Sequence, residues 1–220
     1  MLSEQERLER RSQIGASEIY KLLNFDTQQA QDLFDLKMGL KEHVELDNDA
    51  ITAGNILEED CLDYYENSNN CELLRNERIE HPKIKGLVVS LDAREKATSI
   101  PVENKVIKED VWLSWHAKRS YNALYEDIKL NIPKAYYCQL QIQIATLGVE
   151  IGKLNVNTLT QEEQENPIEV VITEIHNKQV IIYRDDELIE ELEKRAKYML
   201  HCIKYKRRPS ENDYLEKYIY

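Results

Sequence analysis

The amino-acid sequence predicts one α/β domain, a central mixed β-sheet flanked by helices, and three observations support this. Apolar residues recur at helical spacing in the first third of the chain and again near its end. The middle holds short runs rich in Val, Ile and Leu, separated by polar turns. The 220 residues contain no repeat, no low-complexity tract and no Pro/Gly/Ser-rich linker. We therefore expect a single domain over residues 1–220.

Three helices are predicted in the first third. Ser17 can cap a short helix. Asp26 or Thr27 can cap a second, which ends before Gly39. The third covers about residues 48–66, with apolar residues at helical spacing along one side.

Strands and two more helices follow. The predicted strands cover residues 73–79, 86–94, 99–107, 151–156, 168–174 and 179–183. A helix is predicted over residues 134–147, and a last helix carries an apolar stripe from Leu188 to Ile203. Helix, sheet, helix, sheet and helix in one chain indicate an α/β or α+β domain.

Composition and charge exclude some classes of protein. Apolar residues make up 42% and charged residues 32%, as in ordinary globular proteins. No window approaches the ~18 apolar residues of a membrane helix, and the charged N-terminus lacks the apolar core of a signal peptide, so we expect no membrane association and a cytoplasmic location. The net charge of −12 argues against a protein that coats DNA by bulk electrostatics. It leaves room for an enzyme that meets DNA through a local basic patch and bound cations.

The four cysteines do not predict a metal cluster. Cys61, Cys71, Cys138 and Cys202 are far apart and form no CxxC pair. Structural zinc and iron–sulfur sites usually use close pairs or a compact run. We expect reduced, mostly buried thiols.

The main chemical feature is Asp92, followed eleven residues later by Glu103-Asn104-Lys105. Because side chains alternate along a strand, Glu103 and Lys105 share one face and Asn104 lies on the other. A buried Glu–Lys pair needs partners, which an aspartate on the neighbouring strand could supply. Two converging carboxylates suit Mg²⁺ or Mn²⁺, and the lysine could orient or deprotonate a water. The alternative is a solvated edge strand with an ordinary Glu–Lys pair.

Two helical motifs could assist such a site. Gly54 lies one turn before Glu58 on one helix face, and glycine there costs on the order of 1 kcal/mol relative to alanine. The missing side chain would let a backbone or a phosphate approach Glu58. Tyr136 lies one turn before Gln139, and Gln143 shares the face of Gln139, so their amides could bond phosphate or water. The alternatives are a solvated acidic turn and a polar helix surface.

A fourth motif runs from Arg10 to Ser17 and into a helix start. Backbone N–H groups and a hydroxyl at a helix N-terminus, with arginines nearby, can bind an anion. The alternative is a simple serine cap that follows a charged arm.

These four motifs, in this order, resemble the lambda-exonuclease/YqaJ family of viral recombination nucleases, within the PD-(D/E)XK superfamily. The matching segments are Arg10…Ile14-Gly15-Ala16-Ser17-Glu18, Gly54…Glu58, Ser90-Leu91-Asp92, Glu103-Asn104-Lys105 and Tyr136…Gln139-Leu140-Gln141. The resemblance spans about residues 10–209. Leu91 replaces the proline of the superfamily name, as is common in this branch, and Asn104 stands where an apolar residue is more usual.

The resemblance implies a restriction-endonuclease-like core that hydrolyses DNA phosphodiester bonds. It implies that Asp92, Glu103 and the Asn104 carbonyl bind Mg²⁺, with Mn²⁺ as a substitute, and that Glu58 assists a second ion. Lys105 would act on the attacking water.

The family pattern also assigns the remaining site residues. Gln139 would steady the nucleophile or the phosphate. Arg10, Ser17 and Tyr136 would contact DNA, the first two at a 5′-phosphate or a nearby backbone phosphate. Arg10 fits the family spacing to Ser17 better than Arg11 does.

The same resemblance implies partners and a setting. The substrate would be linear double-stranded DNA with free ends, degraded 5′→3′ to leave a 3′ single strand for a single-strand annealing protein. Family members form closed trimeric rings. A phage or prophage protein in the cytoplasm of a bacterial host is the implied source.

Three other functions remain open from the sequence. A structure-specific or restriction-like endonuclease could use the same fold and would cut DNA without an end. A non-catalytic DNA-binding recombination module would have a decayed site, against which the intact Asp92, Glu103 and Lys105 argue. An acidic interaction protein fits the charge but does not account for the order of the motifs.

Overall fold

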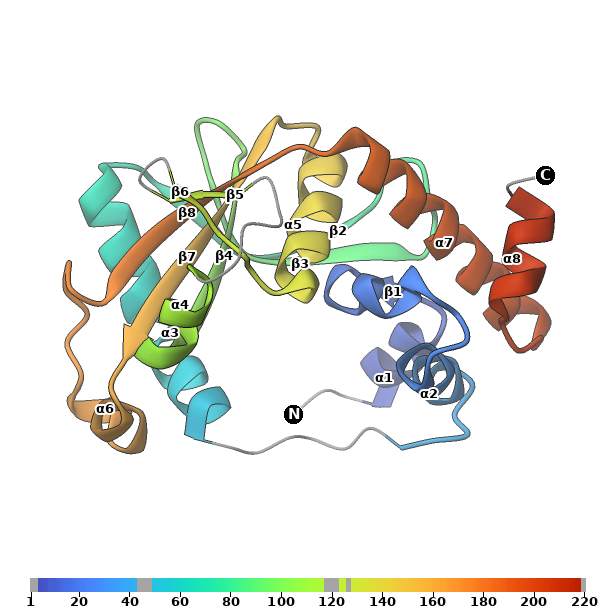
Figure 1. The fold of residues 1–220 in the computed structure, drawn as a ribbon, viewed down its shortest axis with the longest axis horizontal. Helices are drawn as coiled ribbons and strands as arrows, with labels where there is room; N and C mark the ends of the chain where they lie inside the picture. Colours follow the sequence, from blue (N-terminus) through green and yellow to red (C-terminus); the bar gives the residue numbers. More distant parts are fainter. Residues whose placement is uncertain (1–3, 43–48, 117–122, 126–127, 219–220) are drawn as a thin grey trace.

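A mixed β-sheet is the frame of the molecule in the computed structural model, which describes residues 4–42, 49–116, 123–125 and 128–218 (Figure 1). The strands are β1 (Ile14–Gly15), β2 (Leu73–Glu80), β3 (Leu87–Glu95), β4 (Pro101–Lys108), β5 (Ala123–Tyr125), β6 (Ile128–Lys129), β7 (Ile151–Leu159) and β8 (Asn177–Tyr183). The helices are α1 (Glu4–Arg11), α2 (Gln28–Lys37), α3 (Asp49–Asn69), α4 (Glu109–Ser114), α5 (Lys134–Leu147), α6 (Gln161–Glu165), α7 (Asp186–Tyr205) and α8 (Glu211–Tyr218), with 3-10 helices η1 (Ala16–Leu23) and η2 (Pro167–Glu169).

The described strands form one sheet in the order β1-β3-β4-β7-β8-β5-β6, and β2 pairs with β3. β4 runs parallel to β7, and β1 runs parallel to β3, whereas the other pairs are antiparallel. The predicted mixed sheet flanked by helices is therefore confirmed.

The sheet opens between β3 and β4. Val88 pairs with β2 and with β1, and Ala93 pairs with β2 and with β4. Since a residue pairs with one strand on each edge, β1 and β4 both lie along the edge of β3 opposite β2. In the described strands, residues 89–92 of β3 pair with neither of them. The gap lies beside Asp92.

Helices cover the two faces of β4. Side chains alternate along a strand, so Glu103 and Lys105 are on the face that meets α5, while Val102 and Val106 pack against α3. Helix α5 ends at Gly148, whose φ of 68° is in the left-handed region that favours glycine. β4 is thus held between two long helices.

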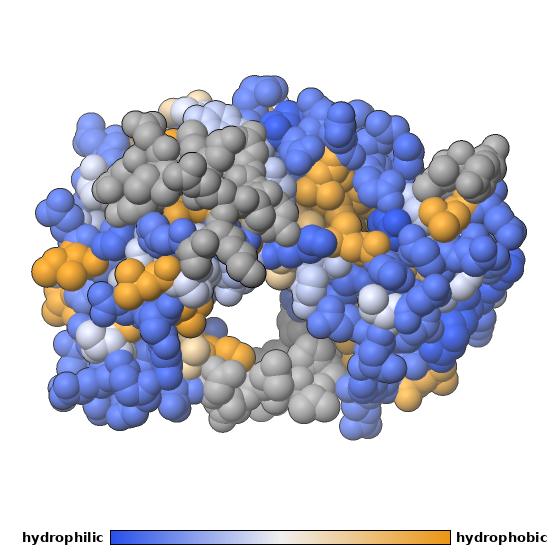
Figure 2. All heavy atoms as spheres, viewed as in Figure 1, coloured by the Kyte–Doolittle hydropathy of each residue, from blue (hydrophilic) through white to orange (hydrophobic). Residues whose placement is uncertain are grey.

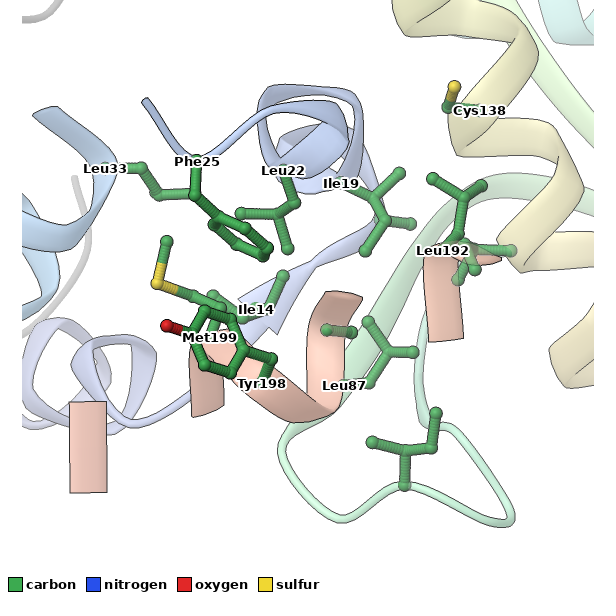
Figure 3. Close-up of a cluster of buried hydrophobic side chains, with 14 of the residues drawn as sticks. Ile14, Ile19, Leu22, Phe25, Leu33, Leu87, Cys138, Leu192, Tyr198 and Met199 are labelled. Carbon is green, nitrogen blue, oxygen red and sulfur yellow. The ribbon is translucent and has the colours of Figure 1, made fainter. Parts of the chain in front are cut away.

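A hydrophobic core joins the two ends of the chain to α5 (Figure 3). Ile19, Leu22 and Phe25, in and just after η1, pack with Leu192 and Met199 of α7. A second core lies between α5 and strands β7 and β8. No helix in the described part of the chain is long and apolar enough to cross a membrane.

The predicted strand at residues 168–174 is wrong. The chain forms η2 there and then an irregular stretch up to Asn177. Ile168 and Val171 are 85% and 75% exposed, while Ile172 packs against α3. β7, the strand that precedes this run, already pairs with β4 and β8 on its two edges, so the run cannot pair with β7 and its β-propensity is overridden.

Ser17 does not cap a helix, contrary to the prediction. η1 begins at Ala16, and the Glu18 carboxylate accepts a 2.8 Å hydrogen bond from the Gly15 N–H. Ser17 lies exposed within the first turn. For α2, by contrast, the predicted cap at Thr27 is confirmed, because its hydroxyl accepts a hydrogen bond from the Ala30 N–H.

A buried arginine fastens the C-terminal helices to η1. Arg195 donates to the Leu22 carbonyl at 2.9 Å and to both oxygens of Glu211 at 2.8 and 3.0 Å. It also pairs with Glu191, and its guanidinium lies 4.5 Å from the centroid of the Tyr214 ring. One side chain therefore links η1, α7 and α8.

We predict that Arg195→Met lowers the free energy of unfolding by about 3 kcal/mol, because a partly buried carboxylate and a carbonyl lose their donor. Urea denaturation measures the change. Lys194→Met is the matched control, since it removes only the exposed Lys194–Glu190 ion pair, and it should leave stability nearly unchanged. Equal losses in the two variants would contradict the assigned role of Arg195.

Candidate active site

Three charged side chains meet where β3 and β4 part. Lys105 Nζ lies 2.5 Å from Glu103 Oε1 and 3.9 Å from Asp92 Oδ2. Asp92 Oδ2 also accepts a 2.8 Å hydrogen bond from the main-chain N–H of Asn104. The aspartate side chain thus bridges the gap where the strands no longer pair. The structure brings together the three residues that the sequence singled out.

Two glutamines of α5 hold the Glu103 carboxylate. Gln139 Nε2 donates to Glu103 Oε1 and Gln143 Nε2 donates to Oε2, each at 2.7 Å. Glu103 is 1% exposed, so these bonds and that of Lys105 replace the water that the carboxylate lost. Residues four apart share a helix face, which is why both amides reach one carboxylate.

Lys105 is held as a cation. Burial alone would lower the pKa of Lys105, but the carboxylates of Glu103 and Asp92 outweigh this effect and raise the pKa above its ordinary value. Its Nζ lies 5.5 Å from the centroid of the Tyr136 ring, a cation–π contact. Tyr136 in turn meets Trp115 edge to face. Lys105 therefore supplies positive charge beside the aromatic rings of Tyr136 and Trp115.

The site has more negative than positive charge. Burial and the nearby Glu103 raise the pKa of Asp92 to about 7, although Lys105 and the Asn104 N–H act in the opposite direction. The charge of Glu58, on α3, adds to the same upward shift. The Lys105 ammonium thus lies within 3.9 Å of two carboxylates, with the charge of Glu58 acting on Asp92 as well, an arrangement that favours binding of a further cation.

Gly54 on α3 has open space around it. A Cβ atom built at Gly54 would have no heavy atom within 4 Å. Packing within the described chain therefore does not require glycine here. Among the described residues, none fills the space next to Gly54, one turn before Glu58.

Arg10 and Ser17 lie outside the Asp92 cluster. Arg10 is exposed in the last turn of α1, and Ser17 is exposed in the first turn of η1. Among the described residues, neither side chain is bonded to the Asp92 cluster. The Arg11 guanidinium packs against Gly39, where an added Cβ would lie 3.0 Å from Arg11 Nη1. Both arginines are exposed, and of the two it is Arg11 whose guanidinium lies against Gly39.

Figure 2 shows an open space between two groups of the described elements, which we call the opening. α3 and α4 border it on one side, and α1, η1 and α2 on the other (Figure 1). The helix that carries Glu58 and the segments that carry Arg10 and Ser17 therefore flank the same space.

The donor atoms fit a hard divalent cation. Asp92 and Glu103 carboxylates and the Asn104 carbonyl are oxygen donors of the kind that Mg²⁺ and Mn²⁺ prefer. In the part of the chain that the structure describes, no three His, Cys, Asp or Glu side chains form a ready-made metal cluster. Magnesium commonly binds through one or two carboxylates, with waters and substrate phosphates as the other ligands. Two carboxylates with excess negative charge meet that requirement.

Gln143 is a site residue that the sequence placed on the face of Gln139 but to which the family pattern assigned no role. Its only signal was the spacing of four from Gln139, which is common on polar helix surfaces. Its Oε1 is buried and has no hydrogen-bond partner among the described residues. It can therefore accept a hydrogen bond from a water beside Glu103.

Comparison with protein families gives one match. A family model described as the YqaJ-like viral recombinase domain matches residues 7–150. That range includes Asp92, Glu103, Lys105 and Gln139. A search of curated proteins gave no match.

Solved structures of exonucleases share the fold. The alkaline exonuclease LHK-Exo from Laribacter hongkongensis matches with a TM-score of 0.70 and 19% identity, over 98% of this chain and 97% of that one. LHK-Exo in complex with dAMP gives 0.68 and 22%, over 93% and 94%. A phage-related exonuclease from Haemophilus somnus gives 0.62 and 15%, over 88% and 96%. The predicted fold class is confirmed.

We predict that Gly54→Ala raises the free energy of unfolding by about 1 kcal/mol, because alanine favours a helix and its Cβ meets open space. Urea denaturation measures this. Gly152→Ala is the matched comparison, since an added Cβ would lie 2.9 Å from Leu140 Cδ2, and it should cost about 1–3 kcal/mol. A loss of stability in Gly54→Ala would show that the space is not open.

Proposed function

Because this chain belongs to the YqaJ-like viral recombinase family, we propose that it is a metal-dependent exonuclease of linear duplex DNA that acts 5′→3′ in phage-type recombination. The observation that carries the proposal is the cluster of Asp92, Glu103 and Lys105 at the opening of the sheet. The likeness in fold to three exonuclease structures supports it.

Asp92, Glu103 and the Asn104 carbonyl would hold a divalent cation, Mg²⁺ with Mn²⁺ as a substitute. Glu58 would assist a second ion from α3. The chemistry that such ions supply when bound is a lower pKa for the attacking water and neutralisation of charge on the phosphate. The excess of carboxylates over ammonium groups supports this assignment.

The protein side chains would position the reactants. Lys105 is protonated, so it would orient the water and offset the negative charge that develops on the phosphate. Gln139 holds Glu103 at 2.7 Å and would steady the nucleophile or the phosphate beside it. Tyr136 would face the DNA and keep the Lys105 ammonium in place through the cation–π contact.

Arg10 and Ser17 would bind the 5′-phosphate of the strand being degraded. Both are exposed, and their segments flank the opening in Figure 2 together with α3. A phosphate held on one side of that opening would fix the distance from the end to the scissile bond. The proposed 5′→3′ polarity itself rests on the family resemblance.

The proposed partners follow from the family. The substrate would be double-stranded DNA with free ends, and a single-strand annealing protein would take up the 3′ strand. Three copies in a ring would make degradation processive. The setting would be the cytoplasm of a bacterium that carries the phage or prophage.

We predict that the protein degrades linear duplex DNA with 5′-phosphates in Mg²⁺, that EDTA stops the reaction, and that a covalently closed circle is not cut. Lys105→Ala should lower the rate at least 100-fold, because one preorganised charge at the phosphate is lost. Gel assays of both substrates measure this.

Lys108→Ala is the matched control, since Lys108 lies on the same strand and bonds Gln161 rather than the site; it should keep normal activity. Cutting of the circle would move the assignment to a structure-specific or restriction-like endonuclease. Binding of DNA without cutting would leave a non-catalytic recombination module.

We predict that Arg10→Ala removes a preference for 5′-phosphorylated over 5′-hydroxyl ends. One charge-assisted hydrogen bond to phosphate is worth about 1.5–3 kcal/mol, or roughly 10- to 150-fold in kcat/KM. Competition between the two ends measures the preference. Arg11→Ala should retain it, because Arg11 packs against Gly39. If only Arg11→Ala lost the preference, Arg11 rather than Arg10 would be the residue that binds the 5′-phosphate.

A further inference from the structure

Four asparagine side chains join three strands behind the proposed active site. The amide groups of Asn155 and Asn157, on β7, donate to the Asn104 side-chain oxygen at 3.0 and 2.9 Å. Asn177, on β8, donates to the side-chain oxygens of Asn155 and Asn157 at 2.7 and 3.0 Å. Asn155 also reaches the main-chain carbonyl of Cys61 on α3, at 3.4 Å. We call these four residues the asparagine ladder.

Three residues of the asparagine ladder are buried, and the fourth, Asn177, is partly buried. Asn155 and Asn157 are 0% exposed and Asn104 is 7% exposed. Buried amides are costly unless they are hydrogen-bonded, and none of the four has a buried nitrogen or oxygen without a partner in the described residues. Apolar side chains could fill the same space, but they would make no directional bonds that fix the strands relative to one another. A satisfied polar network instead favours one arrangement of the strands.

The ladder acts on the strand segment that carries the site. Asn104 lies between Glu103 and Lys105, and it is registered against Asn155 of β7. A slip of β4 by one residue would move the Asn104 side chain to the other face of the sheet and break both of its bonds to β7. The main-chain N–H of the same residue bonds Asp92. The position of Asn104 therefore sets the position of both carboxylates.

Support for β4 comes from both faces. On one face, Gln139 and Gln143 hold the Glu103 side chain. On the other, the ladder holds the Asn104 side chain, beside the Cys61 thiol of α3. Residues 103–105 of β4 have no main-chain pairing with β3. Strand pairing with β3 therefore does not hold this segment in place.

We propose that Asn155, Asn157 and Asn177 are positioning residues, which fix the Glu103–Lys105 segment and the Asn104 carbonyl for the reaction. This inference rests on the proposed nuclease function. None of the three touches the Asp92 cluster directly, because they lie on the opposite face of the sheet. Their effect on the reaction passes through Asn104.

The kinetic test compares Asn157→Val and Asn177→Ala with the wild type, on linear duplex DNA. Asn157→Val should lower kcat on the order of 10-fold and raise the half-saturating Mg²⁺ concentration, while KM for DNA changes little. Asn177→Ala should shift both quantities in the same direction by a smaller factor. Gln179→Ala, on the same strand and face as Asn177, is the matched control and should change neither.

Amide hydrogen exchange of residues 103–105, measured without DNA or metal, gives a readout independent of activity. Exchange should be faster in Asn157→Val and Asn177→Ala than in the wild type, and unchanged in Gln179→Ala. Unaltered exchange and kcat, with only a lower melting temperature, would overturn the proposal. If Asn157→Val does not fold, Asn177→Ala decides by the same criteria.

The two claims can fail separately. A wild type that degrades no DNA with Mg²⁺ or Mn²⁺ sinks the proposed function, and the exchange measurement then decides whether the ladder positions β4. A wild type that is active, with variants that match it in kcat and exchange, sinks the positioning role alone.

Discussion

The burial of one carboxylate, Glu103, is the constraint on which the rest of the site depends. A carboxylate that is 1% exposed must be surrounded by hydrogen-bond donors. Its donors come from two elements, β4 and α5. Lys105 is there because residues two apart share a strand face. Gln139 and Gln143 are there because α5 packs across β4 with one polar stripe facing the strand. A sheet that closed fully between β3 and β4 would leave no opening for a substrate at this carboxylate.

The same burial explains how an acidic chain can suit a polyanionic substrate. The net charge is −12, and the site itself is short of positive charge. Burial, together with the nearby charges of Glu103 and Glu58, raises the pKa of Asp92. Cations from solution, rather than a basic surface, would then carry most of the attraction for phosphate, with Lys105 and Arg10 as local contributions.

Local patterns predicted much of the fold and of the site, and long-range contacts account for the rest. The helix predicted over residues 134–147 is confirmed, because Pro133 and Gly148 mark its two ends. Asp92, Glu103 and Lys105 could be grouped because strand alternation is a local rule. The asparagine ladder joins Asn104 to β7, about fifty residues later, and no local pattern reveals such a pair. The strand expected at 168–174 failed because strand formation needs a free partner edge, which the sequence does not show.

The Arg195 link has a consequence for the order of folding. Arg195 donates to the Leu22 carbonyl and Glu211 accepts from the Phe25 N–H, so these bonds join residues 173 and 186 positions apart in the sequence. Bringing such distant segments together costs loop-closure entropy before any contact forms. η1 and Phe25 share their hydrophobic core with α7, so we expect this part of the fold to form after the contacts that are local in the sequence.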